Sequence, residues 1–386
     1  MKKNIVIISP YPKKGKYTHQ SSALASFSKN LVNYLKSRVK LFIIADNDNL
    51  LDNAEKIWVK NDTLNYFKII KKVLKIKNAR KIIIQYEWGI FGKSIFFIAL
   101  FPLFLFVLRL LGKQPIVVLH GVNFNFKTIF EKDKIKANLL NLGSYIFYIL
   151  VCLISYKIIV TENYFKKQLQ KLPFNKKNIV FIPHGVDSTF KFQKVKISEK
   201  LKLGYFGYLN IYKGPKILLD IFEELDSKKY QLTFYGGESP NLIKDKIYQS
   251  YIKSFYLKAK KIGVKITGFL KQNQLIKYLK DVNLVIFPYQ IFISSSGMLA
   301  LTFSFEKPFL LSRPLEKYFE SPDFAQALKE TGLKKEDLIF DLNKKSLEEK
   351  LSWARKNLKK LSQFSKIMKE KRSWEKVAKI YLEVIK

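Results

Sequence analysis

Two short stretches of the chain contain the residue types that bind phosphate. In the first, Leu203-Gly204-Tyr205-Phe206-Gly207-Tyr208 leads through a loop to Lys213-Gly214, and an amphipathic segment follows over residues 215–225. Glycines let the backbone approach an anion, the first turn of a helix offers unpaired N–H groups, and a lysine adds a point charge. An ordinary strand–turn–helix unit with a surface lysine has the same pattern. Phosphate binding at Lys213 is therefore a hypothesis.

The second stretch is Ser294-Ser295-Ser296-Gly297, which stands between a predicted strand and an apolar helical segment. Small hydroxyl residues and a glycine at this position could hold a phosphate oxygen through the backbone amides at the start of the helix. The same residues would serve equally well as a helix N-cap with no further role. The pattern leaves both interpretations open.

The three histidines lie at the ends of predicted strands or in the loops beside them. His120 ends a strand at the edge where parallel α/β sheets bind ligands, so it is a candidate for a polar contact or for acid–base work. His19 follows the first strand and could approach the same edge. His184 is expected to pack within a turn. The single cysteine, Cys152, excludes an internal disulfide and a thiolate-rich zinc site.

Apolar runs alternate with helical patterns along the chain, which is typical of parallel α/β sheets. In the first half we predict strands over residues 4–9, 39–45, 81–85, 115–120, 157–161 and 178–182. A linker is expected near residues 188–200. A second series follows over residues 201–206, 231–235, 264–267, 284–287 and 309–312, and residues 346–386 read as helical. We therefore predict domains over 1–190 and 191–365, with a final helix over 366–386.

The charge of the chain is strongly positive. Lys and Arg number 70 against 31 Asp and Glu, a formal net charge of +39, and only 6 of the 70 are arginine. Arginine supplies the bidentate contacts that read bases, so this balance argues against specific nucleic-acid recognition. A lysine-rich surface can still attract phosphates and anionic lipid head groups. A compositional bias without function explains the excess equally well.

Two stretches are unusually apolar, Ile95–Leu108 and Ile146–Ile154. Neither run reaches the roughly 18 residues expected of a membrane-spanning helix, so we predict either a buried crossover helix or a segment that lies in a bilayer surface. Over Thr63–Lys77 the four lysines Lys68, Lys71, Lys72 and Lys75 share one helical face, beside an apolar face. Together these features make contact with an anionic membrane surface a hypothesis.

Taken in order, the motifs resemble those of the group 1 (family 4) glycosyltransferases. The matching segments are residues 10–24, Gln85–Gly92, Val117–Gly121, Ile182–Asp187, Gly204–Gly214, Phe234–Gly237, Thr267–Phe269 and Ser373–Ala378. The resemblance implies an α/β protein of the GT-B type. Such a protein has two Rossmann-like parallel-sheet domains that face a cleft, and a C-terminal helix that crosses back to the first domain.

The resemblance also implies roles for individual residues. Lys213 corresponds to the lysine that binds the donor diphosphate, and His120 to the histidine beside the reacting centre; these are the expected catalytic residues. The expected donor-binding residues are Gly15, Tyr208, Lys213, Gly237, Gly268, Ser295, Ser296 and Gly297. His19 and Glu87 are expected on the acceptor side.

The sequence departs from the family pattern in two respects. Tyr208 replaces the usual arginine, and Ile293 and Leu301 stand where the family has paired glutamates. The Ser-Ser-Gly segment is similar to a variant branch in which these residues face the phosphates. The missing glutamates put the usual contacts to the ribose and the sugar hydroxyls in doubt.

The leading hypothesis is an enzyme that moves a sugar from a nucleotide-sugar donor to a hydroxyl acceptor, with retention of configuration. No carboxylate cluster for a metal is visible in the sequence, so we expect no metal or other cofactor. The acceptor is expected to be a glycan or a lipid-linked molecule in surface polysaccharide assembly. We expect a cytoplasmic protein, peripheral on the inner face of the membrane. A catalytically degenerate transferase that acts as a binding protein or scaffold is the alternative, and non-specific nucleic-acid binding is a third.

Overall fold

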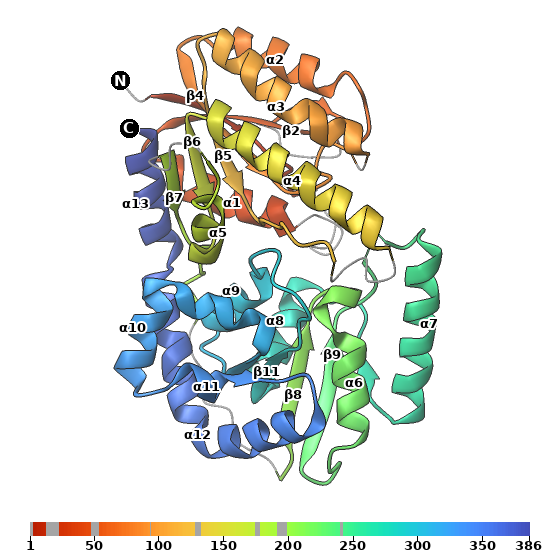
Figure 1. Cartoon of the computed structure of the whole chain (residues 1–386). Coiled ribbons are helices and arrows are strands. Elements are labelled where there is room, and N and C mark those ends of the chain that lie inside the picture. The colour runs from red at the N-terminus through yellow and green to blue at the C-terminus, as the bar shows by residue number, and fades with distance from the viewer. Residues whose placement is uncertain are drawn as a thin grey trace. The chain divides into compact units, whose positions relative to one another are not determined.

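The computed structural model describes residues 3–12, 23–47, 54–92, 94–127, 133–173, 178–190, 199–239 and 242–386. By the contacts between its residues the chain divides into two compact units. Unit 1 comprises residues 1–185, 293–295 and 374–386, and unit 2 comprises residues 186–292 and 296–373. Each unit is an α/β structure built on its own parallel sheet (Figure 1). The two-sheet architecture predicted from the sequence is confirmed.

The sheet of unit 1 has the order β3-β2-β1-β4-β5-β6-β7, and its described pairings are all parallel. Its strands are β1 (Asn4–Ile8), β2 (Lys40–Asp46), β3 (Ala54–Trp58), β4 (Ala79–Tyr86), β5 (Gln114–Leu119), β6 (Lys157–Val160) and β7 (Ile179–Phe181). Strand β3 was not predicted from the sequence. This edge strand reads Ala-Glu-Lys-Ile-Trp and lacks the continuous apolar run by which a buried parallel strand is recognised.

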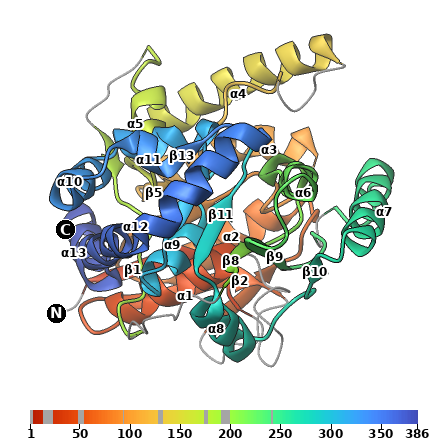
Figure 2. The ribbon, with the colours of Figure 1, turned by 90° about the horizontal axis from the view of Figure 1, so that it is seen from below.

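Helices cover both faces of this sheet because its strands alternate apolar side chains up and down. Helices α1 (Ala23–Leu35) and α13 (Trp374–Ile385) pack on the face that carries Ile5, Ile7 and Ile83. Figure 2 shows α13 beside α1. The opposite face meets α2 (Asn65–Lys75), α3 (Ile95–Leu110) and α4 (Lys134–Ile154), and α5 (Asn163–Leu169) packs beside β6 and β7.

The apolar run over residues 146–154 belongs to a longer helix than the sequence analysis expected. Helix α4 has 21 residues, and by length and composition alone it could cross a membrane. Its most apolar window is 33% buried. The expectation that neither apolar segment reaches spanning length was therefore wrong for α4. Asn138, Asn141 and Ser144 interrupt the apolar run but do not interrupt the helix.

The sheet of unit 2 has the order β10-β9-β8-β11-β12-β13 and is parallel throughout its described pairings. Its strands are β8 (Leu201–Phe206), β9 (Tyr230–Tyr235), β10 (Lys265–Ile266), β11 (Leu284–Phe287), β12 (Phe309–Ser312) and β13 (Ile339–Phe340). The two-residue strand β13 is too short to give a sequence pattern and was not predicted.

The helices of unit 2 are α6 (Pro215–Glu223), α7 (Lys246–Lys261), α8 (Gln272–Asp281), α9 (Gly297–Ser304), α10 (Pro322–Thr331), α11 (Lys335–Leu338) and α12 (Lys344–Lys371). The helical tail predicted from residue 346 onward is two helices, because the backbone leaves α12 at Arg372 before α13 begins in unit 1. Helix α12 also bends at Asn357, whose φ of −118° is not helical.

Candidate functional site

Two loops at the carboxyl edge of the unit 2 sheet meet through their backbones. Gly207 follows β8 with a φ of +123°, and its N–H donates to the carbonyl of Tyr235 over 3.1 Å. A Cβ at Gly236 would overlap the carbonyl oxygen of Gly207. Only glycines allow this approach and this φ. The result is a stretch of exposed backbone at the edge where such sheets bind ligands.

Lys213 reaches the same loop from the chain segment that follows it. It ends the 3₁₀ turn Ile211–Lys213. Gly214, with a φ of +66°, follows as the N-cap of α6. The Lys213 Nζ lies 3.6 Å from the Cβ position of Gly207, and the Met298 Cγ of α9 lies 3.5 Å from that same position. Among the described residues no carboxylate forms an ion pair with Lys213. The glycine loop, this ammonium group and the first turn of α9 therefore converge on one point of unit 2.

Ser296 is the N-cap of α9. Its Oγ accepts from the Leu299 N–H over 3.3 Å, and its own N–H donates to the Tyr318 hydroxyl over 3.0 Å. In the described part of the chain, the N–H groups of Gly297 and Met298 have no acceptor. The capacity of this segment to bind an anion therefore lies in those two amides.

Ser295 belongs by its contacts to unit 1. Its N–H donates to the carbonyl of His120 over 3.2 Å, and its Oγ lies 2.5 Å from the Thr161 Oγ. The backbone of Ile293 lies close to Gly121, and only a glycine fits at position 121 because a Cβ there would overlap the Ile293 carbonyl. Both polar groups of Ser295 are thus occupied, an arrangement that the local sequence pattern could not reveal.

The other predicted donor-side residues surround an aromatic pair. The Tyr208 ring meets the Phe269 ring edge to face, with 5.7 Å between centroids. Phe269 follows Gly268, which has a φ of +66°, and its ring lies 3.0 Å from the Cβ position of Gly237. Phe269 ends the matching segment Thr267–Phe269 but was not predicted as a site residue, although its position directly after a glycine at a strand end was the available signal.

His120 ends β5 in unit 1 and is buried. Its Nε2 lies 2.7 Å from the Gln85 Oε1, so Nε2 carries the proton, and the Phe27 ring packs edge-on at 4.7 Å. Burial, with a smaller contribution from His184, lowers the pKa of His120 to about 3. Near neutral pH the side chain is therefore an uncharged imidazole, suited to hydrogen bonding and not to holding a charge. His184 packs against the rings of Phe27 and Trp374, as expected.

Glu87 is exposed in the loop that follows β4. The next residue, Trp88, donates from Nε1 to the Tyr148 hydroxyl over 3.1 Å, and that hydroxyl donates to the Gly121 carbonyl over 3.4 Å. Helix α4 thereby holds the loops that carry Glu87 and Gly121. Gly15 and His19, the remaining predicted site residues, lie outside the described residues.

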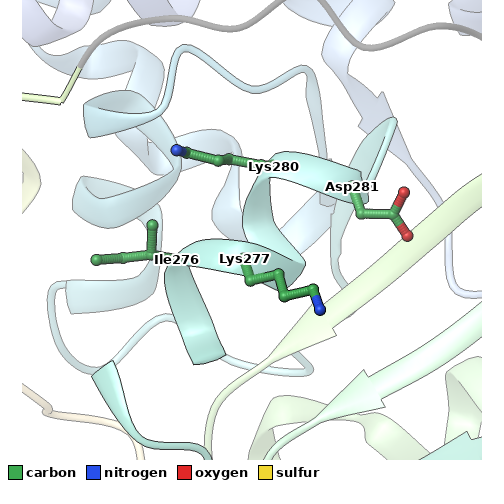
Figure 3. A pocket seen from close by; sticks show the side chains of 4 residues that line it. All are labelled: Ile276, Lys277, Lys280 and Asp281. Carbon is green, nitrogen blue, oxygen red and sulfur yellow. The ribbon is translucent and has the colours of Figure 1, made fainter. Parts of the chain in front are cut away.

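A surface pocket of unit 2 lies elsewhere. It is lined by Ile276, Lys277, Lys280 and Asp281 of α8 (Figure 3). Because α8 ends where β11 begins, this helix end lies at the amino edge of the sheet, away from Gly207 and Lys213. Within the described parts of the chain, no three His, Cys, Asp or Glu side chains gather to hold a metal ion.

The two parallel sheets and their helices define the fold of the GT-B glycosyltransferases. No protein-family profile matches the sequence, and neither does any curated protein. Solved structures do match over nearly the whole chain. Sucrose-phosphate synthase from Thermosynechococcus elongatus is similar with a TM-score of 0.70 at 14% identity, covering 100% of this chain and 99% of its own.

Two further structures show the same likeness. Anabaena Alr3699/HepE in complex with UDP-glucose has a TM-score of 0.67 at 12% identity, with 99% of each chain covered. The apo form of the lipopolysaccharide outer core galactosyltransferase WaaB has a TM-score of 0.62 at 11% identity, again with 99% of each chain covered. At these identities the likeness establishes the fold.

Proposed function

We propose that this protein is a retaining glycosyltransferase, of the group 1 (family 4) type, that moves a sugar from a nucleotide-sugar donor to a hydroxyl acceptor. The observation that carries the proposal is the convergence of Gly207, Lys213 and the first turn of α9 in unit 2. Backbone amides, a helix N-terminus and an ammonium group without a carboxylate partner suit a diphosphate. The likeness to structures that hold UDP and UDP-glucose supports this assignment.

The proposed chemistry needs stabilisation of the leaving diphosphate as its negative charge develops. Lys213 and the amides of Gly297 and Met298 take this role, because fixed donors stabilise charge without reorganisation. In the Ser-Ser-Gly variant branch that we propose, the serine side chains organise this segment and its amides meet the phosphates. The aromatic pair Tyr208 and Phe269 borders the donor site. We propose that the leaving group needs no metal ion, since Lys213 and these amides supply the positive potential.

On the acceptor side the proposal assigns His120 and Glu87, together with Gly15 and His19. His120 contributes a neutral imidazole held by Gln85, which can exchange hydrogen bonds with a sugar hydroxyl without a charge to desolvate. Glu87 is an exposed carboxylate that can orient the acceptor hydroxyl. The acceptor we propose is a glycan or a lipid-linked molecule in surface polysaccharide assembly, reached from the cytoplasmic face of a membrane.

The alternative is a transferase fold that binds nucleotide without turnover. It is favoured by Leu301, which packs against the unit 2 core, and by Ile293, since both stand where the family has glutamates. A screen of UDP and other nucleotide sugars for thermal stabilisation, followed by a turnover assay, distinguishes the two functions. UDP-sugars are the first donors to test. Stabilisation with transfer supports the enzyme, stabilisation without transfer supports the binding protein, and no stabilisation by any nucleotide contradicts both.

A further inference from the structure

Helix α3 exposes an apolar face along its whole length. Ile95, Phe96, Leu103, Phe106 and Leu110 recur at helical spacing and are all exposed, with 72% of Ile95 and 54% of Leu103 accessible. The opposite side of the helix is buried on the sheet. A solvent-facing side made of large apolar residues is unusual for a helix that packs on a core, because that side is normally polar.

Helix α4 repeats this arrangement next to α3. Its exposed apolar residues follow the same helical spacing and are Ile135, Leu139, Leu142, Ile146, Leu150 and Leu153, with 77% of Ile135 and 58% of Leu142 accessible. The two helices pack against each other in unit 1, as Figure 1 shows. Their exposed residues form what we call the α3–α4 face. Apolar patches of this extent mark interaction sites.

The charges around the α3–α4 face select the partner. Residues 94–127 and 134–161 contain no Asp or Glu, whereas exposed Arg109 ends α3 and exposed Lys134 begins α4. On the neighbouring helix α2, Lys68 and Lys72 form ion pairs with Asp62 and Glu55, at 2.5 and 2.6 Å. Within the described chain, exposed Lys71 and Lys75 have no such pair. The lysine face predicted from the sequence is therefore half neutralised, and the cations that we assign to the basic rim are Lys71, Lys75, Arg109 and Lys134.

We propose that the α3–α4 face is a docking surface for an anionic lipid bilayer, in which both helices lie in the plane of the interface. An apolar surface whose two helices carry no Asp or Glu, and whose rim is basic apart from Asp133 at the N-cap of α4, matches acyl chains bordered by negative head groups. Helix α3, with 16 residues, is about 24 Å long and too short to span. Helix α4 stays in the plane of the interface because its buried side is bound to the rest of unit 1. Phe147 packs on Tyr86, and the Tyr148 hydroxyl forms hydrogen bonds with Trp88 and Gly121.

This orientation connects the bilayer to the acceptor side. Helix α3 begins just after the loop of Glu87, and α4 begins after the loop of His120. The starts of both helices therefore lie at the carboxyl edge of the sheet, where those residues are. A lipid-linked acceptor held in the bilayer would present its head group at that edge. This consequence rests on the proposed function, whereas docking itself does not.

Vesicle flotation without donor or acceptor tests the docking surface. The wild-type protein should float with vesicles of phosphatidylcholine and phosphatidylglycerol, and float less with phosphatidylcholine alone. The variant L103Q/F106Q/L142Q/I146Q should bind at least about a hundredfold more weakly at any salt concentration, because the burial of four large apolar side chains is lost. The variant K71Q/K75Q should bind about thirtyfold more weakly at low salt and almost normally at high salt.

The chain offers a matched control on α7 of unit 2. Ile247 and Leu257 are 77% and 62% exposed on a lysine-rich helix of the other unit, so I247Q/L257Q removes apolar groups of similar exposure that do not belong to the α3–α4 face. This control should float like the wild type. As a milder probe, L103W and L142W should shift their fluorescence to the blue on vesicles, and L257W should not. Thermal melts of all variants report whether they fold.

The proposal is overturned if the wild type does not float with anionic vesicles, or if the four-residue variant floats as the wild type does. It is also overturned if that variant turns a dimer into a monomer in light scattering without weakening flotation, since the face would then join two copies of the chain. UDP binding is measured on the same proteins. A wild-type protein that binds UDP but does not float contradicts only the docking surface. A wild-type protein that floats but does not bind UDP contradicts only the proposed function.

Discussion

The ligand-binding edges of the two sheets are built in different ways. In unit 2 the edge consists of glycine backbone, a helix N-terminus and one ammonium group, that of Lys213, so its character is positive. In unit 1 the corresponding position is a buried imidazole that hydrogen bonds to Gln85 and has no charge near neutral pH. The same topology thus gives an edge suited to an anion in one unit and an edge suited to uncharged groups in the other. Four changes test this contrast.

The largest effect is expected from Gly214→Ala. Gly214 has a φ of +66°, and a Cβ there would overlap the Pro288 carbonyl, so the loop that carries Lys213 must move. We expect a loss of unfolding free energy of about 3 kcal/mol, together with loss of nucleotide binding. Gly332→Ala is the matched control, since Gly332 has a φ of +64° with open space around it. It should cost only about 1–2 kcal/mol in a denaturant titration. Equal losses in both variants would contradict the role assigned to the close approach.

Lys213→Ala should remove the charge from the unit 2 site. Losing a charge-assisted hydrogen bond to the diphosphate should weaken the binding of UDP by about 1.5–3 kcal/mol, measured by calorimetry. Lys213→Arg should retain part of the affinity, while Lys216→Ala on the neighbouring α6 should leave it unchanged. Unchanged affinity in Lys213→Ala would show that the anion site lies elsewhere.

The neutral site of unit 1 should be revealed by the effect of acid on stability. The pKa of His120 is lowered to about 3 in the folded protein, against 6.5 for the ordinary side chain. Below pH 6.5 the unfolded chain takes up a proton that the folded chain does not, so the folded state loses stability as the pH falls from 6.5 towards 3. At pH 5 this loss is about 2 kcal/mol.

His120→Asn should remove this part of the pH dependence, as measured by unfolding at a series of pH values. The comparison between wild type and variant cancels the titration of other groups. Parallel curves for the two proteins would mean that His120 is not buried in the neutral form.

The smallest effect is expected from Phe269→Leu. Losing the edge-to-face contact with Tyr208 should lower the unfolding free energy by about 1 kcal/mol. The binding of inorganic diphosphate should not change, because Lys213 and the α9 amides remain. Weaker binding of UDP with unchanged binding of diphosphate would place the base beside this aromatic pair, and weaker binding of both would contradict the separation of the two parts of the site.

The sequence allowed the sheets to be predicted but not the partners of the site residues. Buried parallel strands such as β1 and β11 are continuous apolar runs, which are local signals. The polar edge strand β3 and the two-residue β13 have no such signal. The length of α4 was missed because two asparagines and a serine interrupt its apolar pattern, although helix formation tolerates them on a partly exposed surface.

Lys213 was predicted to bind phosphate from its glycine flanks; the structure places it beside the loop of Gly207, and its role stays a prediction. The hydrogen bonds of Ser295 to His120 and Thr161 join residues more than a hundred positions apart, and no local pattern encodes such pairs. The same holds for the ion pairs of Lys68 and Lys72, whose partners precede α2 in the chain. Spacing along a helix indicates which side chains share a face but not which of them remain charged towards the surroundings.

The position of α13 has a consequence for the order in which the chain folds. Trp374, Val377 and Tyr381 cover one face of the unit 1 sheet, yet the ribosome adds them after every strand of unit 2. The seven strands of unit 1 emerge first, but this face stays partly uncovered until α13 follows. The unit that is synthesised first is therefore the last to be completed, and we expect its apolar sheet face to be prone to aggregation during translation.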